Sequence, residues 1–229
     1  MTRNVVDTEA ANEQRDRSSP ASTVQSFFDD FDATNKGVPK NWMLFSGLAV
    51  DVNEMPQDLT LTDASGDSAG IYSTLPSSVV HPVATSTTIE AQVKGVSPNP
   101  VGNAICGLLG LPNGNGPTGY LAAGIDANGV VFIVEQQQNP KIAQTIVPIG
   151  KVANYNQGPI LLTFTINSTG VVVSAGAFNS GEISFSKKLN NFSLNAAFGD
   201  GAVPALVGAS QPTEKGGSAS FESICVSTG

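Results

Sequence analysis

The chain has 229 residues, of which 40% are hydrophobic and only 13% are charged, with 24 glycines and 14 prolines. Its net charge is −8 and its 11 lysines and arginines are scattered, so nucleic acid and anionic membranes are poor partners, because both are bound by clustered basic residues. The charged share is about half of the ~25% typical of soluble domains, so uncharged polar residues must cover the surface. This composition favours an extracellular, cell-surface or particle-surface β protein over a cytosolic helical enzyme.

Residues 1–25 are predicted to form a flexible N-terminal arm, followed by one domain over residues 26–229. The first part of the arm is polar and mixes Arg3, Arg15 and Arg17 with acidic residues. It has no apolar core of the kind a signal peptide needs, and no later apolar run approaches the ~18 residues of a membrane span. The remaining length suits a single β-sandwich of ~200–250 residues.

Beyond the arm, the sequence predicts short strands separated by turns. Alternation of apolar and polar residues is clearest over residues 88–94 and 219–226, which predicts strands with one wet face. A link rich in glycine and proline is expected at residues 96–118, on both sides of a short strand that contains Cys106, and a second long loop is expected at residues 199–217. The predicted strands are residues 42–52, 59–62, 69–73, 87–94, 104–109, 120–125, 130–136, 145–152, 160–166, 171–176, 182–187, 194–198 and 219–226.

Two stretches, residues 120–138 and 160–178, share one design: an apolar run, a polar turn that ends in glycine, and a second run rich in valine. The turns DANG (126–129) and NSTG (167–170) supply residues that tolerate left-handed backbone angles between β-branched strands. Both stretches are therefore predicted to be antiparallel hairpins. A chain built from such units is an all-β protein, an antiparallel β-sandwich or barrel.

Four features of the chain belong together: the opening FFDDFD (27–32), the PKNW that ends at Trp42, the two hairpins, and the closing strand SASFESI (218–224). Together they resemble the concanavalin A-like lectin/glucanase jelly-roll superfamily. The resemblance spans nearly the whole chain from about Ser26 and implies a jelly-roll sandwich. Among its branches, the chain looks most like the laminin-G-like and carbohydrate-binding ones. The expected function is that of a noncatalytic glycan-binding or adhesion domain of lectin-like type, with a glycan or polysaccharide as partner.

Two alternatives remain open. The glucanase branch of this superfamily carries an E-x-D-x-E strand whose carboxylates act as nucleophile and general acid, whereas Glu90 and Glu135 of this chain each stand alone. A pair assembled from separate strands, for example Glu90 with Glu135 or Glu182, would make the protein a glycan-cleaving enzyme, a glycoside hydrolase or polysaccharide lyase with a diverged site. The third interpretation is a structural or coat protein that self-assembles into oligomers.

Sugar binding requires an exposed aromatic ring beside amide groups, because sugar C–H faces stack on rings while hydroxyls need paired donors and acceptors. The single tryptophan, Trp42, lies in an apolar run and is expected in the core. Tyr155, within VANYNQGP, is the best candidate for an exposed ring. The candidate carbohydrate-binding residues are Tyr155, Asn154, Asn156, Gln157, Tyr120 and Asn115.

Three acidic residues at the start of the domain, Asp29, Asp30 and Asp32, could hold calcium, because hard cations favour clustered carboxylates. The resemblance implies a structural calcium between the first and last strands, which would bring Glu222 into the site, although the family usually has aspartate there. The alternative is that these are solvated turn residues. The single histidine, His81, cannot form a multi-histidine metal site.

The two cysteines, Cys106 and Cys225, both lie in apolar strand-like segments. A long-range disulfide requires that the two strands be neighbours. Two buried free thiols are the other interpretation, because cysteine packs as a small hydrophobic residue.

Overall fold

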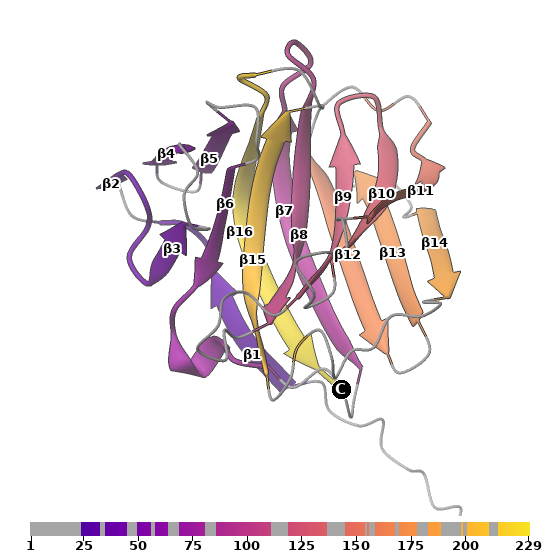
Figure 1. Cartoon of the computed structure of the whole chain (residues 1–229), viewed down its shortest axis with the longest axis horizontal. Coiled ribbons are helices and arrows are strands. Elements are labelled where there is room, and N and C mark those ends of the chain that lie inside the picture. The colour runs from indigo at the N-terminus through magenta and orange to yellow at the C-terminus, as the bar shows by residue number, and fades with distance from the viewer. Residues whose placement is uncertain are drawn as a thin grey trace, which may run out of the picture.

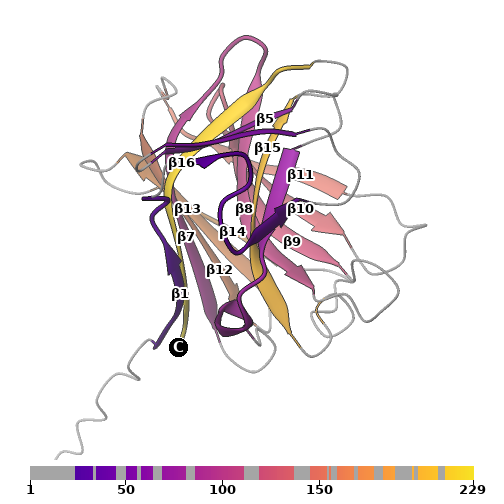
Figure 2. The same ribbon diagram turned by 90° about the vertical axis from the view of Figure 1, so that its left-hand side faces the viewer.

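The structure is a computed structural model of the whole chain (Figure 1). It describes residues 24–32, 35–44, 50–55, 58–63, 69–80, 86–110, 119–136, 145–153, 155, 159–167, 170–177, 183–188, 198, 201–210 and 215–229. These residues form two antiparallel sheets that stack face to face, as Figure 2 shows from the side. The predicted antiparallel β-sandwich is confirmed.

The larger sheet, sheet A, has nine strands in the order β14-β13-β12-β7-β16-β5-β4-β2, with β1 paired to β16. Its closing strand β16 lies between β7 on one side and β5 and β1 on the other, so the two ends of the described chain are joined in one sheet. The strands are β1 (Val24–Asp29), β2 (Asn35–Lys36), β4 (Val50–Met55), β5 (Asp58–Asp63), β7 (Thr87–Val96), β12 (Ile160–Asn167), β13 (Gly170–Ala177), β14 (Ile183–Lys188) and β16 (Ser218–Thr228).

The smaller sheet, sheet B, has seven strands in the order β11-β10-β9-β8-β15-β6-β3. A short 3-10 helix, η1 (Pro76–Ser78), follows β6. The strands are β3 (Trp42–Leu44), β6 (Ala69–Ser73), β8 (Gly102–Gly110), β9 (Tyr120–Asp126), β10 (Val130–Gln136), β11 (Thr145–Lys151) and β15 (Ala202–Ser210).

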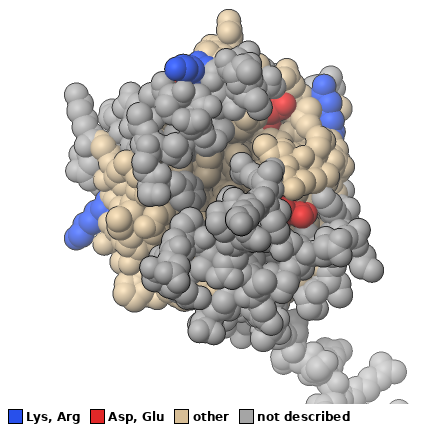
Figure 3. Space-filling view, in the orientation of Figure 1, with Lys and Arg blue, Asp and Glu red and all other residues tan. Residues whose placement is uncertain are grey.

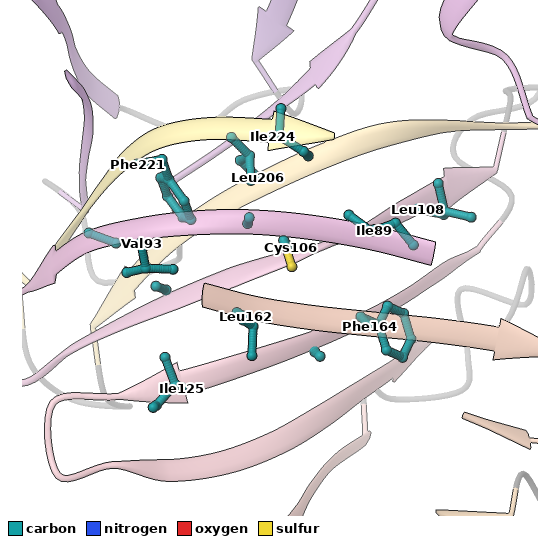
Figure 4. Close-up of a cluster of buried hydrophobic side chains, with 14 of the residues drawn as sticks. Ile89, Val93, Cys106, Leu108, Ile125, Leu162, Phe164, Leu206, Phe221 and Ile224 are labelled. Carbon is teal, nitrogen blue, oxygen red and sulfur yellow. The ribbon is translucent and has the colours of Figure 1, made fainter. Parts of the chain in front are cut away.

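The main hydrophobic core fills the space between the sheets (Figure 4). In β7 buried and more exposed residues alternate, so Ile89 and Val93 point inward while Glu90 points to solvent. Facing them from sheet B are Cys106 and Leu108 of β8 and the inward residues of β9 and β15. Period-two alternation therefore decides which face of each strand is buried.

Both predicted hairpins are confirmed. In the first, the Asp126 carboxylate accepts hydrogen bonds from the backbone N–H groups of Asn128 (2.8 Å) and Val130 (2.9 Å), and Gly129 has a φ of +79°. In the second, the side-chain oxygen of Asn167 accepts a hydrogen bond from the N–H of Gly170 at 3.0 Å. Polar side chains thus bond the backbone of each turn, as such turn residues do.

Strand β15 is the main difference from the sequence-based prediction, which assigned residues 199–217 to a loop because of Pro204 and Pro212. The structure instead places Ala202–Ser210 as a central strand between β8 and β6. Pairing with β6 begins only at Ala205, so at Pro204 the missing N–H removes no hydrogen bond to β6.

Other boundaries also differ. The strand predicted at residues 42–52 is divided between β3 in sheet B and β4 in sheet A. β1 begins at Val24, two residues before the predicted domain start, and most of the predicted strand 194–198 lies outside the described residues, as does the arm up to residue 23. Within the described part of the chain, no helix is long and apolar enough to span a membrane.

The two cysteines are free, so the disulfide alternative is wrong. Cys106 lies on β8 with its sulfur between the sheets (Figure 4), whereas Cys225 alternates with the buried Ile224 and Val226 on β16 and faces outward from sheet A. Burial raises the pKa of the Cys106 thiol from 9.0 to about 12. The thiols cannot meet because sheet A separates them.

Candidate functional site

The outer face of sheet B, the side away from the core, carries the second hydrophobic cluster of the molecule. Strand pairing brings Tyr72, Ala205, Gly107, Ala122 and Val134 side by side, on five neighbouring strands. Apolar residues of the adjacent rows complete the cluster. Its buried members are Ile105, Leu109, Tyr120, Ala122, Phe132, Val134, Val203, Ala205 and Val207.

The centre of this face has a floor of small residues, Ala205, Gly107 and Ala122. A Cβ atom at Gly107 would collide with the Ala122 side chain and with the carbonyl oxygen of Leu121. On the neighbouring row, a Cβ atom at Gly124 would lie 2.5 Å from Cζ of Phe132, so this ring crosses from β10 over β9. The floor is therefore closely packed and apolar.

Among the described residues, charged groups are sparse on the side of the molecule that Figure 3 shows, which is the sheet B side. Its described residues are mainly uncharged, and the few described acidic and basic side chains stand apart from one another. Only two carboxylates belong to the central strands β8, β9, β10 and β15. Asp126, at the turn end of β9, is on the outer-face side with Ala122, whereas Glu135, near the far end of β10, is on the core-facing side of its strand with Ile133.

Asp126 and Glu135 are too far apart to act on one glycosidic bond together. Glu135 pairs with Leu121, five residues before Asp126 on the same strand, which corresponds to roughly 16 Å at ~3.3 Å per residue. Catalytic carboxylate pairs in glycosidases are about 5 to 9.5 Å apart. The Asp126 carboxylate is also engaged with the backbone of its own turn.

The pair of Glu90 and Glu135 suggested by the sequence is also excluded. Glu90 is exposed on the outer face of sheet A, where its strand neighbours are Thr163 and Cys225. Glu135 belongs to the other sheet, about 10 Å away, and Glu90 points away from it. Glu182, the third carboxylate considered for such a pair, lies outside the described residues.

Neither tyrosine of the predicted sugar site is an exposed platform. Tyr155 packs against the β9–β10 turn, where a Cβ atom at Gly129 would lie 2.8 Å from the Cβ of Tyr155. Burial, with a smaller contribution from the charge of Asp126, raises the pKa of Tyr155 to about 12. Its hydroxyl is buried and has no hydrogen-bond partner among the described residues. Tyr120 is only 7% exposed, within the outer-face cluster.

The other four residues of that prediction, Asn154, Asn156, Gln157 and Asn115, lie outside the described residues. Carbohydrate binding by the six residues stays a prediction. The exposed ring expected at Tyr155 is absent because the residues after β11 fold back over the hairpin turn, as shown by the hydrogen bond from the N–H of Val152 to the Gly129 carbonyl (2.9 Å). Nothing in the local sequence signals this contact.

Asp29 has a structural role that the sequence analysis missed. Its Oδ2 accepts a hydrogen bond from the indole N–H of Trp42 at 2.8 Å, and its Oδ1 accepts one from the N–H of Phe31 at 3.0 Å. The Trp42 ring packs edge-on against Phe27, at a centroid distance of 5.9 Å, and against Phe31 at 5.8 Å. Asp29 therefore joins β1 to β3 beside a buried aromatic group.

The remaining predicted metal ligands are not gathered around Asp29. Asp30 and Asp32 are exposed, and Glu222 accepts a hydrogen bond from the side chain of Gln92 on sheet A. Among the described residues, no group of three or more histidine, cysteine, aspartate or glutamate side chains is placed to hold one metal ion. Calcium binding at Asp29, Asp30, Asp32 and Glu222 stays a prediction.

No protein-family model and no curated protein sequence matches the chain. Solved structures do match its fold. SCLam, a non-specific endo-β-1,3(4)-glucanase of family GH16, has a TM-score of 0.62 and 11% identity over 91% of this chain and 92% of its own. A GH16 protein of Bacteroides ovatus, from its mixed linkage glucan locus and in complex with product, has a TM-score of 0.56 and 14% identity over 87% and 99%.

An antigen of Mycobacterium tuberculosis called a pseudo β-1,3-glucanase matches as well, with a TM-score of 0.56 and 15% identity over 89% of this chain and 98% of its own. At these identities the likeness shows the fold alone, a jelly-roll β-sandwich like that of the GH16 glucanases. The laminin-G-like branch finds no support.

The function expected from the sequence must be corrected. A noncatalytic lectin-like or adhesion domain was the main prediction, yet the matching structures include several glucanases of family GH16. The match covers nearly the full length of these glucanase structures, so it involves the whole glucanase fold and not one part of it. The alternative interpretation from the sequence, a glycan-cleaving enzyme with a diverged site, agrees better with these matches.

Proposed function

We propose that the protein is a glycan-cleaving enzyme of endo-glucanase type that acts on β-1,3- or mixed-linkage β-1,3/1,4-glucan. The observation that carries the proposal is the end-to-end likeness to GH16 endo-glucanases, one of them in complex with a mixed-linkage product. One fold can carry many different activities. Turnover is therefore the quantity to measure, and the more so because one protein of this fold is called a pseudo-glucanase.

Hydrolysis of a glycosidic bond requires one carboxylic acid to protonate the leaving oxygen and a second carboxylate to act as nucleophile or to activate water. Asp126 and Glu135 belong to the central strands of sheet B but are too distant to form that pair with each other. The described strands of sheet B contain no other carboxylate, so a partner for either would have to come from outside these strands. Asp126, Glu135 and Glu182 are accordingly the carboxylates to substitute first.

The decisive experiment incubates the full-length protein with a soluble β-1,3-glucan and with a mixed-linkage β-glucan. New reducing ends and chain length are both measured, because an endo-acting enzyme shortens the chains before it releases much free sugar. We expect shortened products without an unsaturated sugar end, which separates hydrolysis from lyase chemistry. Absence of shortened chains from both glucans, at high protein concentration and long incubation, would contradict the proposal.

Matched variants then locate the chemistry. Asp126→Asn, Glu135→Gln and Glu182→Gln each remove one negative charge with almost no change in shape. Glu90→Gln is the control, because Glu90 is exposed on the opposite sheet. Loss of a catalytic carboxylate should lower kcat by about 10²-fold or more, whereas the control should leave it unchanged. A loss of activity in Glu90→Gln would show that the reaction takes place on sheet A.

A further inference from the structure

One row of residues crosses the whole of sheet B on its outer face, from the edge strand β11 to the edge strand β3. These two strands lie on opposite sides of the sheet (Figure 1). The row continues the five side-by-side residues from Val134 to Tyr72 described above. Ile146 of β11 lies beyond Val134, and Met43 of β3 lies beyond Tyr72. A ligand of this face can contact the row only where its residues are exposed.

The row is buried at its centre and open at both ends. Val134, Ala122 and Ala205 are 0% exposed. In contrast, Ile146 is 54% exposed, Met43 is 53% exposed, and Tyr72 beside Met43 is partly exposed. A sugar chain can therefore reach the ends of the row but not its closely packed floor.

Only one of the two ends offers an aromatic ring. β11 contains no aromatic residue, so its exposed apolar side chain, Ile146, is aliphatic. At the other end, the Tyr72 hydroxyl donates a hydrogen bond to the sulfur of Met43 at 3.8 Å. Tyr72 and Met43 lie directly opposite each other on strands ~4.8 Å apart, so the ring and the thioether form one apolar surface.

Polar groups lie next to this surface. Asn41 directly precedes β3, Thr74 directly follows β6, and both are exposed. The backbone N–H of Thr74 donates a hydrogen bond to the carbonyl oxygen of Asn41 at 2.8 Å, which continues the pairing of the two strands. An amide and a hydroxyl group are therefore each two residues from the apolar pair. Sugars bind to such a combination, because their C–H faces stack on rings and their hydroxyls need donors and acceptors.

We propose that Tyr72, Met43, Asn41 and Thr74, together the Tyr72 patch, bind one sugar of a neutral β-glucan chain by stacking on the Tyr72 ring. This inference rests on the proposed function, because its ligand is the glucan that the enzyme would cleave. The four residues carry no charge, which suits a neutral chain. Two apolar side chains are too few for a protein partner, since a standard interface buries about 800 Å² on each side.

The Tyr72 patch binds substrate and takes no part in bond cleavage. Neither β3 nor β6 contains a carboxylate, so these strands supply no acid or nucleophile. A contact made equally in the ground state and in the transition state lowers KM and leaves kcat unchanged. Loss of the contact should therefore raise KM alone, whereas damage to the fold or to the reacting groups would lower kcat.

Two measurements on the full-length protein test the patch. Calorimetry gives the dissociation constant for a mixed-linkage β-glucan oligosaccharide, and initial rates give kcat and KM for soluble mixed-linkage β-glucan. Tyr72→Ala should raise the dissociation constant and KM by about threefold to tenfold, the contribution of one aromatic contact, with kcat unchanged. Phe28→Ala is the matched control and should change neither, because Phe28 is an aromatic residue 52% exposed on the opposite sheet.

Oxidation of Met43 in the unmodified protein gives an independent readout, should Tyr72→Ala fail to fold. Hydrogen peroxide converts methionine to its sulfoxide, and mass spectrometry of peptides measures the rate at each position. The bound oligosaccharide should slow the oxidation of Met43. Met55 is the internal reference, because it belongs to β4 of the other sheet, and its rate should not change.

The outcomes separate this inference from the proposed function. Weaker binding by Tyr72→Ala, with protection of Met43, supports the Tyr72 patch even where the wild type cleaves no glucan, and then only the proposed hydrolysis is wrong. If the wild type binds or cleaves glucan and Tyr72→Ala does so with equal affinity, the patch alone is overturned. An equal loss of affinity in Phe28→Ala also overturns it. A wild type that neither binds nor cleaves glucan overturns both proposals.

Discussion

Replacement of Asp29 by alanine should destabilise the fold by about 2 to 6 kcal/mol. The reason is that its carboxylate accepts hydrogen bonds from two buried donors, the indole N–H of Trp42 and the backbone N–H of Phe31. Trp42 is 5% exposed and Phe31 is fully buried, so the two donors have little access to water once the acceptor is removed. Phe31 also has a φ of +49°, a left-handed conformation that the bond from Asp29 supports.

The magnitude follows from the cost of each donor left unsatisfied, about 1–3 kcal/mol. Asp29→Asn keeps one acceptor oxygen, so it should cost about half as much as Asp29→Ala. Asp30→Ala is the matched control, because Asp30 is the adjacent aspartate and is exposed. Its substitution should change stability by less than about 0.5 kcal/mol.

Urea unfolding followed by far-ultraviolet circular dichroism provides the assay, and it also serves for variants that lack the single tryptophan. A double-mutant cycle of Asp29→Asn with Trp42→Phe should give a coupling energy of about 1.5–3 kcal/mol, as expected for a hydrogen bond to a charged group. Additive effects in the cycle, or a stability of Asp29→Ala equal to that of Asp30→Ala, would refute this reasoning.

The remaining predictions concern the thiols, the outer-face floor and calcium. In the native protein a thiol reagent should modify Cys225 before the fully buried Cys106. Burial raises the pKa of the Cys225 thiol, and the negative charge of Glu90 raises it further. Glu90→Gln removes that charge and should therefore speed the reaction of Cys225. Burial raises the pKa of the Cys106 thiol from 9.0 to about 12, so the protonated thiol stabilises the folded protein fully below pH 9 and this stabilisation is lost as the pH rises toward about 12. The urea midpoint of the wild type should therefore fall more between these pH values than the midpoint of Cys106→Ala. Gly107→Ala should cost about 1–3 kcal/mol in urea unfolding because its methyl group meets Ala122 and the Leu121 carbonyl, and an unchanged midpoint would show that the strands can separate there. The calcium prediction implies a chelator-reversible rise in melting temperature; an unchanged midpoint would leave Asp29 with its hydrogen-bonding role alone.

The sequence alone was sufficient for the local architecture. Alternation over β7 and β16 and the turn residues of the two hairpins depend on neighbours in the chain, and these elements are confirmed. The prediction of sheet strands around Cys106 and Cys225 was equally local. It could not say whether the two thiols meet, because that depends on which sheet each strand joins.

The candidate site was predicted less well for the same reason. Tyr155 was expected to be exposed from a polar local sequence, but it is half-buried by a turn more than 25 residues earlier in the chain. Glu90 and Glu135 were suggested as a pair because each stood alone on a strand, and only the assignment of β7 to sheet A and β10 to sheet B separates them.

By itself the sequence determined the period-two strands, the turns and the all-β class, since these follow from side-chain alternation and from residues that tolerate left-handed backbone angles. Only the tertiary structure decided that β15 is a central strand despite Pro204, that Asp29 binds Trp42, and that the outer face of sheet B is apolar. These features depend on contacts between separate strands: β15, for example, pairs with β8 about a hundred residues earlier and with β6 more than 130 residues earlier. Such pairing is selected by packing of the whole sandwich, and no local sequence pattern encodes it.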